Sequence, residues 1–160
     1  MKRFFFLTCL FYYMSCAVFI PGYRDYSYAK KYYKKGQYDL SADHLFKSLT
    51  IKPNNEKAIY LFVFSYDNAV YEHQQEINRL LSIEKKSKWP SLVAEYTSLI
   101  KLGNHVKRLK PLLKNTVNYD LELKVDDYSN KLLHAKAGAA DYHYTLGLKF
   151  QDEADKENQK

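Results

Sequence analysis

The chain has 160 residues, enough for one modest domain or a few helical repeats, and its hydrophobic content of 46% excludes a wholly disordered protein. Five glycines and four prolines are too few for a turn-rich β-sandwich, whereas sixteen tyrosines and nine phenylalanines suit helix packing and protein-binding surfaces. The formal charge is +7, but the lysine pairs are scattered and form no single stripe, so nucleic acid is not an expected partner.

The first residues have the anatomy of an export signal. Lys2 and Arg3 give a basic start, an apolar run follows from Phe4 to Met14, and the small Ser15 stands at its end. A basic region, a short apolar core and a small boundary residue are the parts of a secretory signal. We therefore expect residues 1–15 to be a signal peptide and residues 16–22 a tether, with the mature chain exported to the cell envelope and facing the periplasm.

Both cysteines lie in this region, so neither disulfides nor thiol catalysis are expected in the mature fold. The stretch Tyr13-Met14-Ser15-Cys16 resembles a bacterial lipobox, with Tyr13 in place of the usual Leu. The resemblance implies lipidation of Cys16 and a membrane-tethered lipoprotein. Two alternatives stay open: the apolar run up to Ile20 is an uncleaved anchor, or the signal is removed without lipidation.

Residues 23–55 are expected to form two helices joined by a tight turn. Ala29 is small and lets the second helix approach closely, and Gly36 closes the first helix with a positive φ. Ser41 and Ser48 are seven residues apart, so they share one face of the second helix.

The same segment resembles one unit of the tetratricopeptide repeat (TPR) family. Pro53 ends the second helix, Asn54 or Asn55 caps the next one, and the stretch matches the TPR period of about 34 residues. The positions that carry the resemblance are Tyr28-Ala29, Tyr32, Gly36-x-Tyr38, Ser41, Ser48 and Pro53. The resemblance implies an all-α fold of TPR-like antiparallel helical hairpins, a short α-solenoid, with predicted TPR lipoproteins of Bacteroidetes-type bacteria as the similar group.

A second, degenerate repeat is expected over residues 56–85. It comprises a helix over 56–68, a connection at Ala69-Val70-Tyr71 that lacks the Gly-x-Tyr turn, and a partner helix over 74–83. The apolar stripe of the first helix is Ala58, Phe62 and Tyr66. The apolar positions of the second helix are Ile77, Leu80 and Leu81.

The remainder is expected to be helical around one extended stretch. Residues 86–125 combine a helix over 91–113, interrupted near Gly103 and Pro111, with an alternating stretch over 115–125 that favours an extended loop over a strand. In residues 126–160, Asp126 or Asp127 caps a helix running to about Asp152, which resembles a TPR first helix and precedes a polar tail. Either this helix caps the array or the sequence is truncated in mid-repeat: a capping helix needs a polar outer face, whereas apolar side chains spread around this one.

No motif of known catalytic, cofactor or metal chemistry is present, so no catalytic residue, cofactor or metal ligand is predicted. The strongest metal candidate is His73, which has Glu72 beside it and Glu76 three residues on. A histidine with nearby carboxylates is common on exposed surfaces, and zinc needs at least three protein ligands, so no zinc site is predicted there. Asp43 and His44 are adjacent and are expected to point to different helix faces.

In TPR arrays the first helices line a concave groove, and here it is predicted to bind a protein or peptide. The predicted groove residues are Tyr26, Lys30, Tyr33, Lys34, Tyr60, Phe64, Asp67 and Asn68. Aromatic side chains give contact area at little entropic cost, and the lysines can meet a carboxylate. We therefore expect an interaction scaffold and not an enzyme. The alternative is a non-TPR helical envelope assembly or stress factor bound peripherally to membrane, and an enzyme of unknown class comes third.

Overall fold

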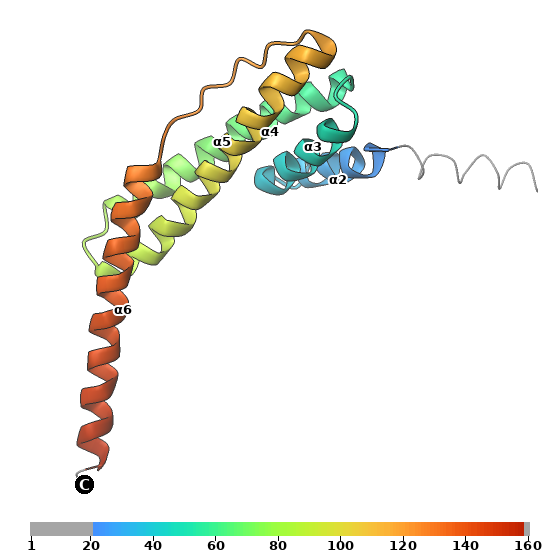
Figure 1. Ribbon diagram of the computed structural model, residues 1–160. Coiled ribbons are helices and arrows are strands. Elements are labelled where there is room, and N and C mark those ends of the chain that lie inside the picture. Colours follow the sequence, from blue (N-terminus) through green and yellow to red (C-terminus); the bar gives the residue numbers. More distant parts are fainter. Residues whose placement is uncertain (1–20, 159–160) are drawn as a thin grey trace, which may run out of the picture. The chain divides into compact units, whose positions relative to one another are not determined.

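The computed structural model describes residues 21–158, and this part of the chain is all-helical, with five α-helices and no strand. The predicted signal segment, Cys16 and most of the predicted tether lie outside the described residues. The helices are α2 (Tyr23–Tyr33), α3 (Tyr38–Ile51), α4 (Glu56–Leu81), α5 (Trp89–Val117) and α6 (Ser129–Asn158), with a short 3-10 turn, η2 (Lys86–Lys88), before α5 (Figure 1). None of the described helices is long and apolar enough to cross a membrane.

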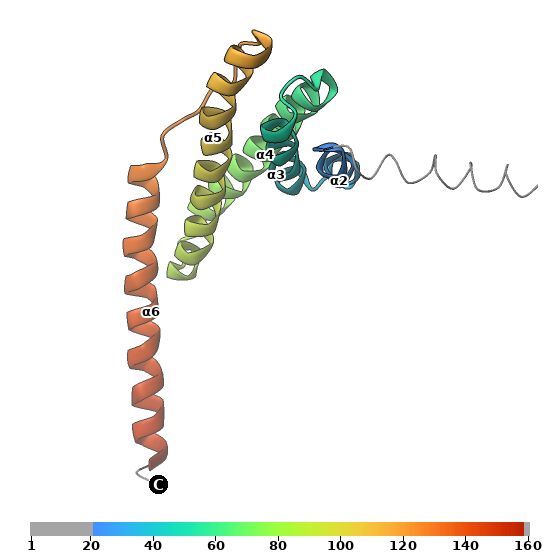
Figure 2. The same ribbon diagram turned by 45° about the vertical axis from the view of Figure 1, so that its right-hand side comes forward.

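The chain divides into two compact units. Unit 1 contains residues 21–69 and 104–124, and unit 2 contains residues 70–103 and 125–158. Unit 1 therefore holds the α2–α3 hairpin with parts of α4 and α5, while unit 2 holds the remaining parts of α4 and α5 with η2 and α6 (Figure 2).

The α2–α3 hairpin in unit 1 forms as the sequence predicts. Gly36 closes the turn after α2 with φ 70°, a left-handed conformation that a residue with a Cβ adopts only with strain. Ala29, Ser41 and Ser48 are completely buried, so the small positions do lie between the helices. The Asn55 Oδ1 accepts a hydrogen bond from the Ala58 amide at 3.3 Å, which caps α4 as expected.

Helix α4 corrects the expected second hairpin. The connection predicted at residues 69–71 does not exist, because one unbroken helix of 26 residues runs from Glu56 to Leu81. Ala69, Val70 and Tyr71 contain no glycine or proline, and Ala69 is itself completely buried. Nothing local ends the helix at this point, so the TPR period alone led to the wrong boundary.

Helix α5 is also unbroken, contrary to the predicted interruptions near Gly103 and Pro111. Proline cannot donate to the carbonyl four residues earlier, so Pro111 removes one helical hydrogen bond, but the helix continues to Val117. Leu109 and Leu113 on either side of Pro111 are completely buried in unit 1. Their burial offsets the lost hydrogen bond.

An extended loop follows α5 as predicted, but it begins at residue 118 and not at 115, because α5 continues to Val117. Residues 118–128 have no helix or strand, and the alternation expected from the sequence is present in unit 1: Leu121 is buried, Tyr119 and Leu123 are half-buried, and the intervening residues are exposed. The Tyr66 hydroxyl of α4 donates to the Lys124 carbonyl at 2.7 Å. The loop is thus held on unit 1 by alternate side chains, by this hydrogen bond, and by one that the Tyr119 amide donates to the Leu113 carbonyl at 3.3 Å.

Unit 2 has its own apolar core. It joins α4, α5, the end of the loop and α6 through Ile77, Leu80, Leu92, Tyr96, Leu99, Tyr128 and Ala135. The Asp127 carboxylate accepts a hydrogen bond from the Ser129 amide at 2.9 Å, which confirms the expected cap of α6. The last turns of α6 extend beyond this core, and every described side chain from Gly147 onward is exposed (Figures 1 and 2).

Candidate functional site

A hollow of about 390 Å³ lies between α2 and α4 in unit 1. We call it the α2–α4 groove, and its lining residues are Tyr26, Lys30, Tyr33, Lys34, Lys57, Tyr60, Leu61 and Phe64. Positions 26, 30, 33 and 34 share one face of α2, and positions 57, 60, 61 and 64 share one face of α4, because residues three and four apart lie together on a helix. Two amphipathic stripes therefore face the same space.

The groove walls are aromatic and the charges around it have one sign. Tyr60 and Phe64 keep 60% and 56% of their surfaces exposed, although both are large and apolar. The Lys30 ammonium lies 5.2 Å from the centre of the Tyr26 ring, a cation–π distance. The lining includes three lysines and no acidic residue. Such a surface suits a ligand that combines an apolar side chain with negative charge.

Buried serines fix α2 and α4 on either side of α3. The Ser41 hydroxyl donates to the Ala29 carbonyl of α2 at 3.0 Å and lies 2.8 Å from the Ser65 hydroxyl of α4. Because the Ser41 proton is used on Ala29, the Ser65 hydroxyl is the donor in the second hydrogen bond. One small side chain of α3 thus connects both helices that form the groove.

A second buried serine holds the start of α2. The Ser48 hydroxyl donates to the Gly22 carbonyl at 2.8 Å, and Gly22 adopts φ 77° at the N-cap of α2. A Cβ at position 22 would lie 3.0 Å from the Ser48 carbonyl oxygen. Glycine is therefore required both by the backbone conformation and by the close approach of α3.

Adjacent residues of α3 bind helices on two different sides. The His44 Nδ1 lies 2.9 Å from the Asp25 carboxylate of α2, and the Asp43 carboxylate lies 2.8 Å from the His105 Nε2 of α5. The two imidazoles also stack on rings, His44 on Tyr32 and His105 on Phe46. The expectation that Asp43 and His44 point to different faces is confirmed.

Six of the eight predicted groove residues line the groove. The other two, Asp67 and Asn68, follow Phe64 on α4 and do not line the groove. The Asn68 side chain donates to the Phe64 carbonyl at 2.7 Å. Partial burial of the Asp67 carboxyl raises its pKa. Sequence reasoning missed Lys57 and Leu61. The spacing of three and four residues from Tyr60 and Phe64 was the signal that could have found them.

The part of the chain that the structure describes has no group of three side chains placed to ligate a metal ion. In unit 2 the His73 Nδ1 lies 2.6 Å from the Glu95 carboxylate of α5, while Glu76 pairs with Arg79 on its own helix. That ion pair lowers the pKa of Glu76 and raises the pKa of Arg79. The zinc arrangement considered for His73, Glu72 and Glu76 is therefore not formed.

Unit 2 has a more polar hollow of about 300 Å³ around two tyrosines. Gln74 donates to the Tyr128 hydroxyl at 3.1 Å, and Lys131 lies 5.5 Å from the centre of the Tyr128 ring. Burial, with a smaller contribution from Tyr128, raises the pKa of Tyr96. Both tyrosines of this hollow are largely buried, whereas Tyr60 and Phe64 are exposed in the α2–α4 groove, so that groove is the stronger candidate for a binding surface.

Comparison of the chain with protein-family models, with curated proteins and with solved structures finds no match. The TPR resemblance stays a prediction from the residues that carry it.

Proposed function

We propose that this chain is a TPR-like scaffold of the cell envelope that binds a peptide or protein segment in the α2–α4 groove. The single observation that carries the proposal is the groove itself. Exposed Tyr60 and Phe64 face the α2 stripe across a hollow large enough for a side chain or two, and Lys30, Lys34 and Lys57 surround it.

The local structure of the α2–α3 hairpin supports the TPR-like part of the proposal. The buried small residues Ala29, Ser41 and Ser48 and the positive φ of Gly36 provide the close helix approach and the tight turn that a TPR unit needs. In the same proposal, residues 1–15 export the chain and a lipid on Cys16, or an uncleaved anchor, tethers it to the membrane.

A specific observation favours the alternative of a non-TPR helical assembly factor. A TPR array needs a second hairpin, and α4 continues as one helix through the position where that hairpin would turn. In this alternative the α2–α3 hairpin is a single cap on a long helical pair, and the groove is still available to a partner.

The test uses matched tyrosines on α4. Tyr60 lies in the groove and Tyr71 lies outside it on the same helix, and the two are 60% and 63% exposed. The full-length chain, Tyr60→Ala and Tyr71→Ala are probed with an array of peptides that combine one aromatic residue with zero to four acidic residues.

We expect aromatic, acidic peptides to bind the wild-type chain and Tyr71→Ala, and to bind Tyr60→Ala at least tenfold more weakly, since a buried aromatic anchor contributes about 1.4 kcal/mol or more. Lys34→Glu should weaken the acidic peptides more than the neutral ones. Equal loss in Tyr60→Ala and Tyr71→Ala, or no peptide binding at all, would contradict the proposal.

A further inference from the structure

Helix α6 carries two apolar faces, and only one of them is used inside unit 2. The packed face includes Ala135, which is completely buried, and Gly138, whose Cα lies against the Trp89 indole. The other face, which we call the outer stripe, consists of Leu133, Ala137, Ala140, Tyr144 and Leu148, all exposed. Their spacing of four, three, four and four residues places them along one side of the helix.

The exposure of the outer stripe is large for such residues. Leu133 is 68% exposed, Tyr144 is 70% exposed and Leu148 is 50% exposed. A helix normally has one apolar stripe that faces its core and a polar opposite side. The spacing keeps the outer stripe on one side of α6, where another helix can pack along it, and its alanines with the neighbouring Gly147 would allow that helix to approach closely.

The charges along α6 indicate what kind of helix packs on the outer stripe. Its first turns carry Lys131 and Lys136 without an acidic residue, whereas its last turns carry Asp152, Glu153, Asp155 and Glu157 against two lysines. This order is the reverse of the one that the helix dipole favours, which places acids at the start and bases at the end. An antiparallel copy of the same helix would bring each basic start beside an acidic end and would also oppose the two dipoles.

We propose that two copies of this chain associate in an antiparallel arrangement through one face of α6, which contains the outer stripe and continues beyond it, at the same spacing, to Gln151 and Asp155. In the register that we infer, Tyr144 of each copy packs on Gly147 of the other, which sets a large side chain against a position without one. The segment that contains Lys136 then lies opposite Asp155 of the second copy, and Ala140 lies opposite Gln151. Such a twofold interface uses the same surface on both chains and is independent of the α2–α4 groove.

The experiment is cysteine cross-linking between two differently tagged full-length copies that are expressed together. One copy carries Ala140→Cys and the other carries Gln151→Cys, at two exposed positions of α6. Cys9 and Cys16 are kept, and each variant expressed with the wild-type chain measures the background from them. A pair with Ala140→Cys in both copies reports either a parallel arrangement or an antiparallel one in a register centred on Ala140.

We expect the 140–151 pair to cross-link well above background and the 140–140 pair to stay at background. Tyr144→Glu should abolish the 140–151 cross-link without loss of helical circular dichroism, because Tyr144 is 70% exposed. Lys136→Glu should weaken the cross-link, and Asp155→Lys in the other copy should restore it. A 140–151 signal no higher than background, a 140–140 cross-link in its place, or cross-links only to other proteins would overturn the proposal.

Discussion

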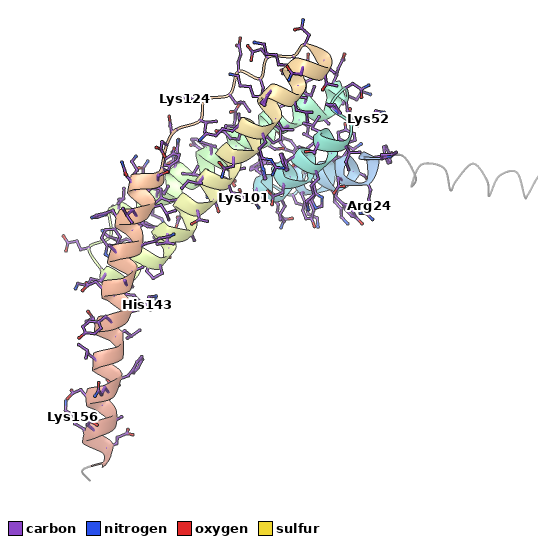
Figure 3. All side chains as sticks on the ribbon, viewed as in Figure 1. Arg24, Lys52, Lys101, Lys124, His143 and Lys156 are labelled. Atoms are coloured by element: carbon purple, nitrogen blue, oxygen red, sulfur yellow. The ribbon has the colours of Figure 1, made fainter. Side chains whose placement is uncertain are left out.

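The Trp89 indole packs directly on Gly138 of α6, so closely that a Cβ at position 138 would overlap the ring. The two residues belong to the same unit, and their contact joins the start of α5 to the first third of α6. Close contact of a large ring with a glycine leaves no room for adjustment, because the overlapping atoms belong to the rigid indole and not to the end of a flexible chain. The side chains of α6 appear as sticks in Figure 3.

Gly138→Ala should therefore destabilise the protein by about 1–3 kcal/mol, the usual cost of overpacking a tight contact. Gly147→Ala on the same helix is the matched control, since nothing in the chain lies within 4 Å of the added methyl group, and both variants are made in the Tyr144→Glu background to remove the proposed contact with a second copy. Gly147→Ala should stabilise α6 by about 0.5–1 kcal/mol through helix propensity. Urea denaturation followed by circular dichroism measures both, and equal effects would show that Trp89 does not restrain position 138.

Two neighbouring phenylalanine positions test which face of α4 is buried. Phe62 is completely buried in unit 1, and Phe64 is 56% exposed in the groove. Phe62→Ala should lower the free energy of unfolding by about 3–5 kcal/mol, because it leaves a cavity. Phe64→Ala should change it by less than about 1 kcal/mol. Similar losses for the two variants would mean that the groove face of α4 is covered.

The serine link across α3 is testable with a double-mutant cycle. Ser41→Ala removes the donor to the Ala29 carbonyl and the acceptor of the Ser65 hydroxyl, and should cost about 1–3 kcal/mol. Ser65→Ala should cost less, because Ser41 keeps its hydrogen bond to Ala29. The double variant should cost less than the sum of the two single variants, since the shared hydrogen bond is lost only once. Additive losses would show that the two hydroxyls do not interact.

Two glycines with positive φ should respond differently to alanine. Gly36 has open space around it, so Gly36→Ala adds only the strain of the left-handed conformation, about 1–2 kcal/mol. At Gly22 the added methyl group also approaches the Ser48 carbonyl, so Gly22→Ala should cost more. Chemical denaturation of the two variants under the same conditions gives the comparison, and a larger loss at Gly36 would contradict the close approach of α3 to Gly22.

The raised pKa of Tyr96 predicts a loss of stability at alkaline pH. The folded state favours the neutral phenol, so this contribution is present below the ordinary tyrosine pKa of about 10 and is lost as pH rises through the raised folded value. Tyr96→Phe should therefore lose less stability than the wild type between pH 9 and 11. Tyr60→Phe, at an exposed position, is the control and should follow the wild type.

Local chemistry decided which features the sequence could predict. The turn at Gly36 and the caps at Asn55 and Asp127 depend on single residues with strong conformational preferences, and all three are present. The boundary at residues 69–71 was inferred from a repeat period, with no breaker residue there, and it is wrong. The interruption at Pro111 was wrong for the opposite reason, because burial of Leu109 and Leu113 outweighs a local breaker.

The groove was partly predictable for a similar reason. Shifting the α2 positions by one repeat period located Tyr60 correctly opposite Tyr26 and Tyr33. The same shift selected Asp67, which does not line the groove, and left out Lys57, which does. Which turns of α4 face α2 depends on how α3 holds the two helices, through the hydrogen bonds of Ser41 with Ala29 and Ser65, and a repeat alignment does not give that placement.

The extended loop after α5 separates two properties that usually occur together in a core. Leu121 is completely shielded from solvent, yet its backbone belongs to neither a helix nor a strand. Amide hydrogen exchange reports on backbone hydrogen bonding, whereas side-chain burial reports on packing. The Tyr119 and Leu123 amides donate to the Leu113 and Leu121 carbonyls. The amide protons of residues 120–122 should therefore exchange with deuterium far sooner than those of Phe62 or Leu109, although Leu121 is buried just as completely. A deuterium map of this protein would show a fast-exchanging segment inside its apolar core.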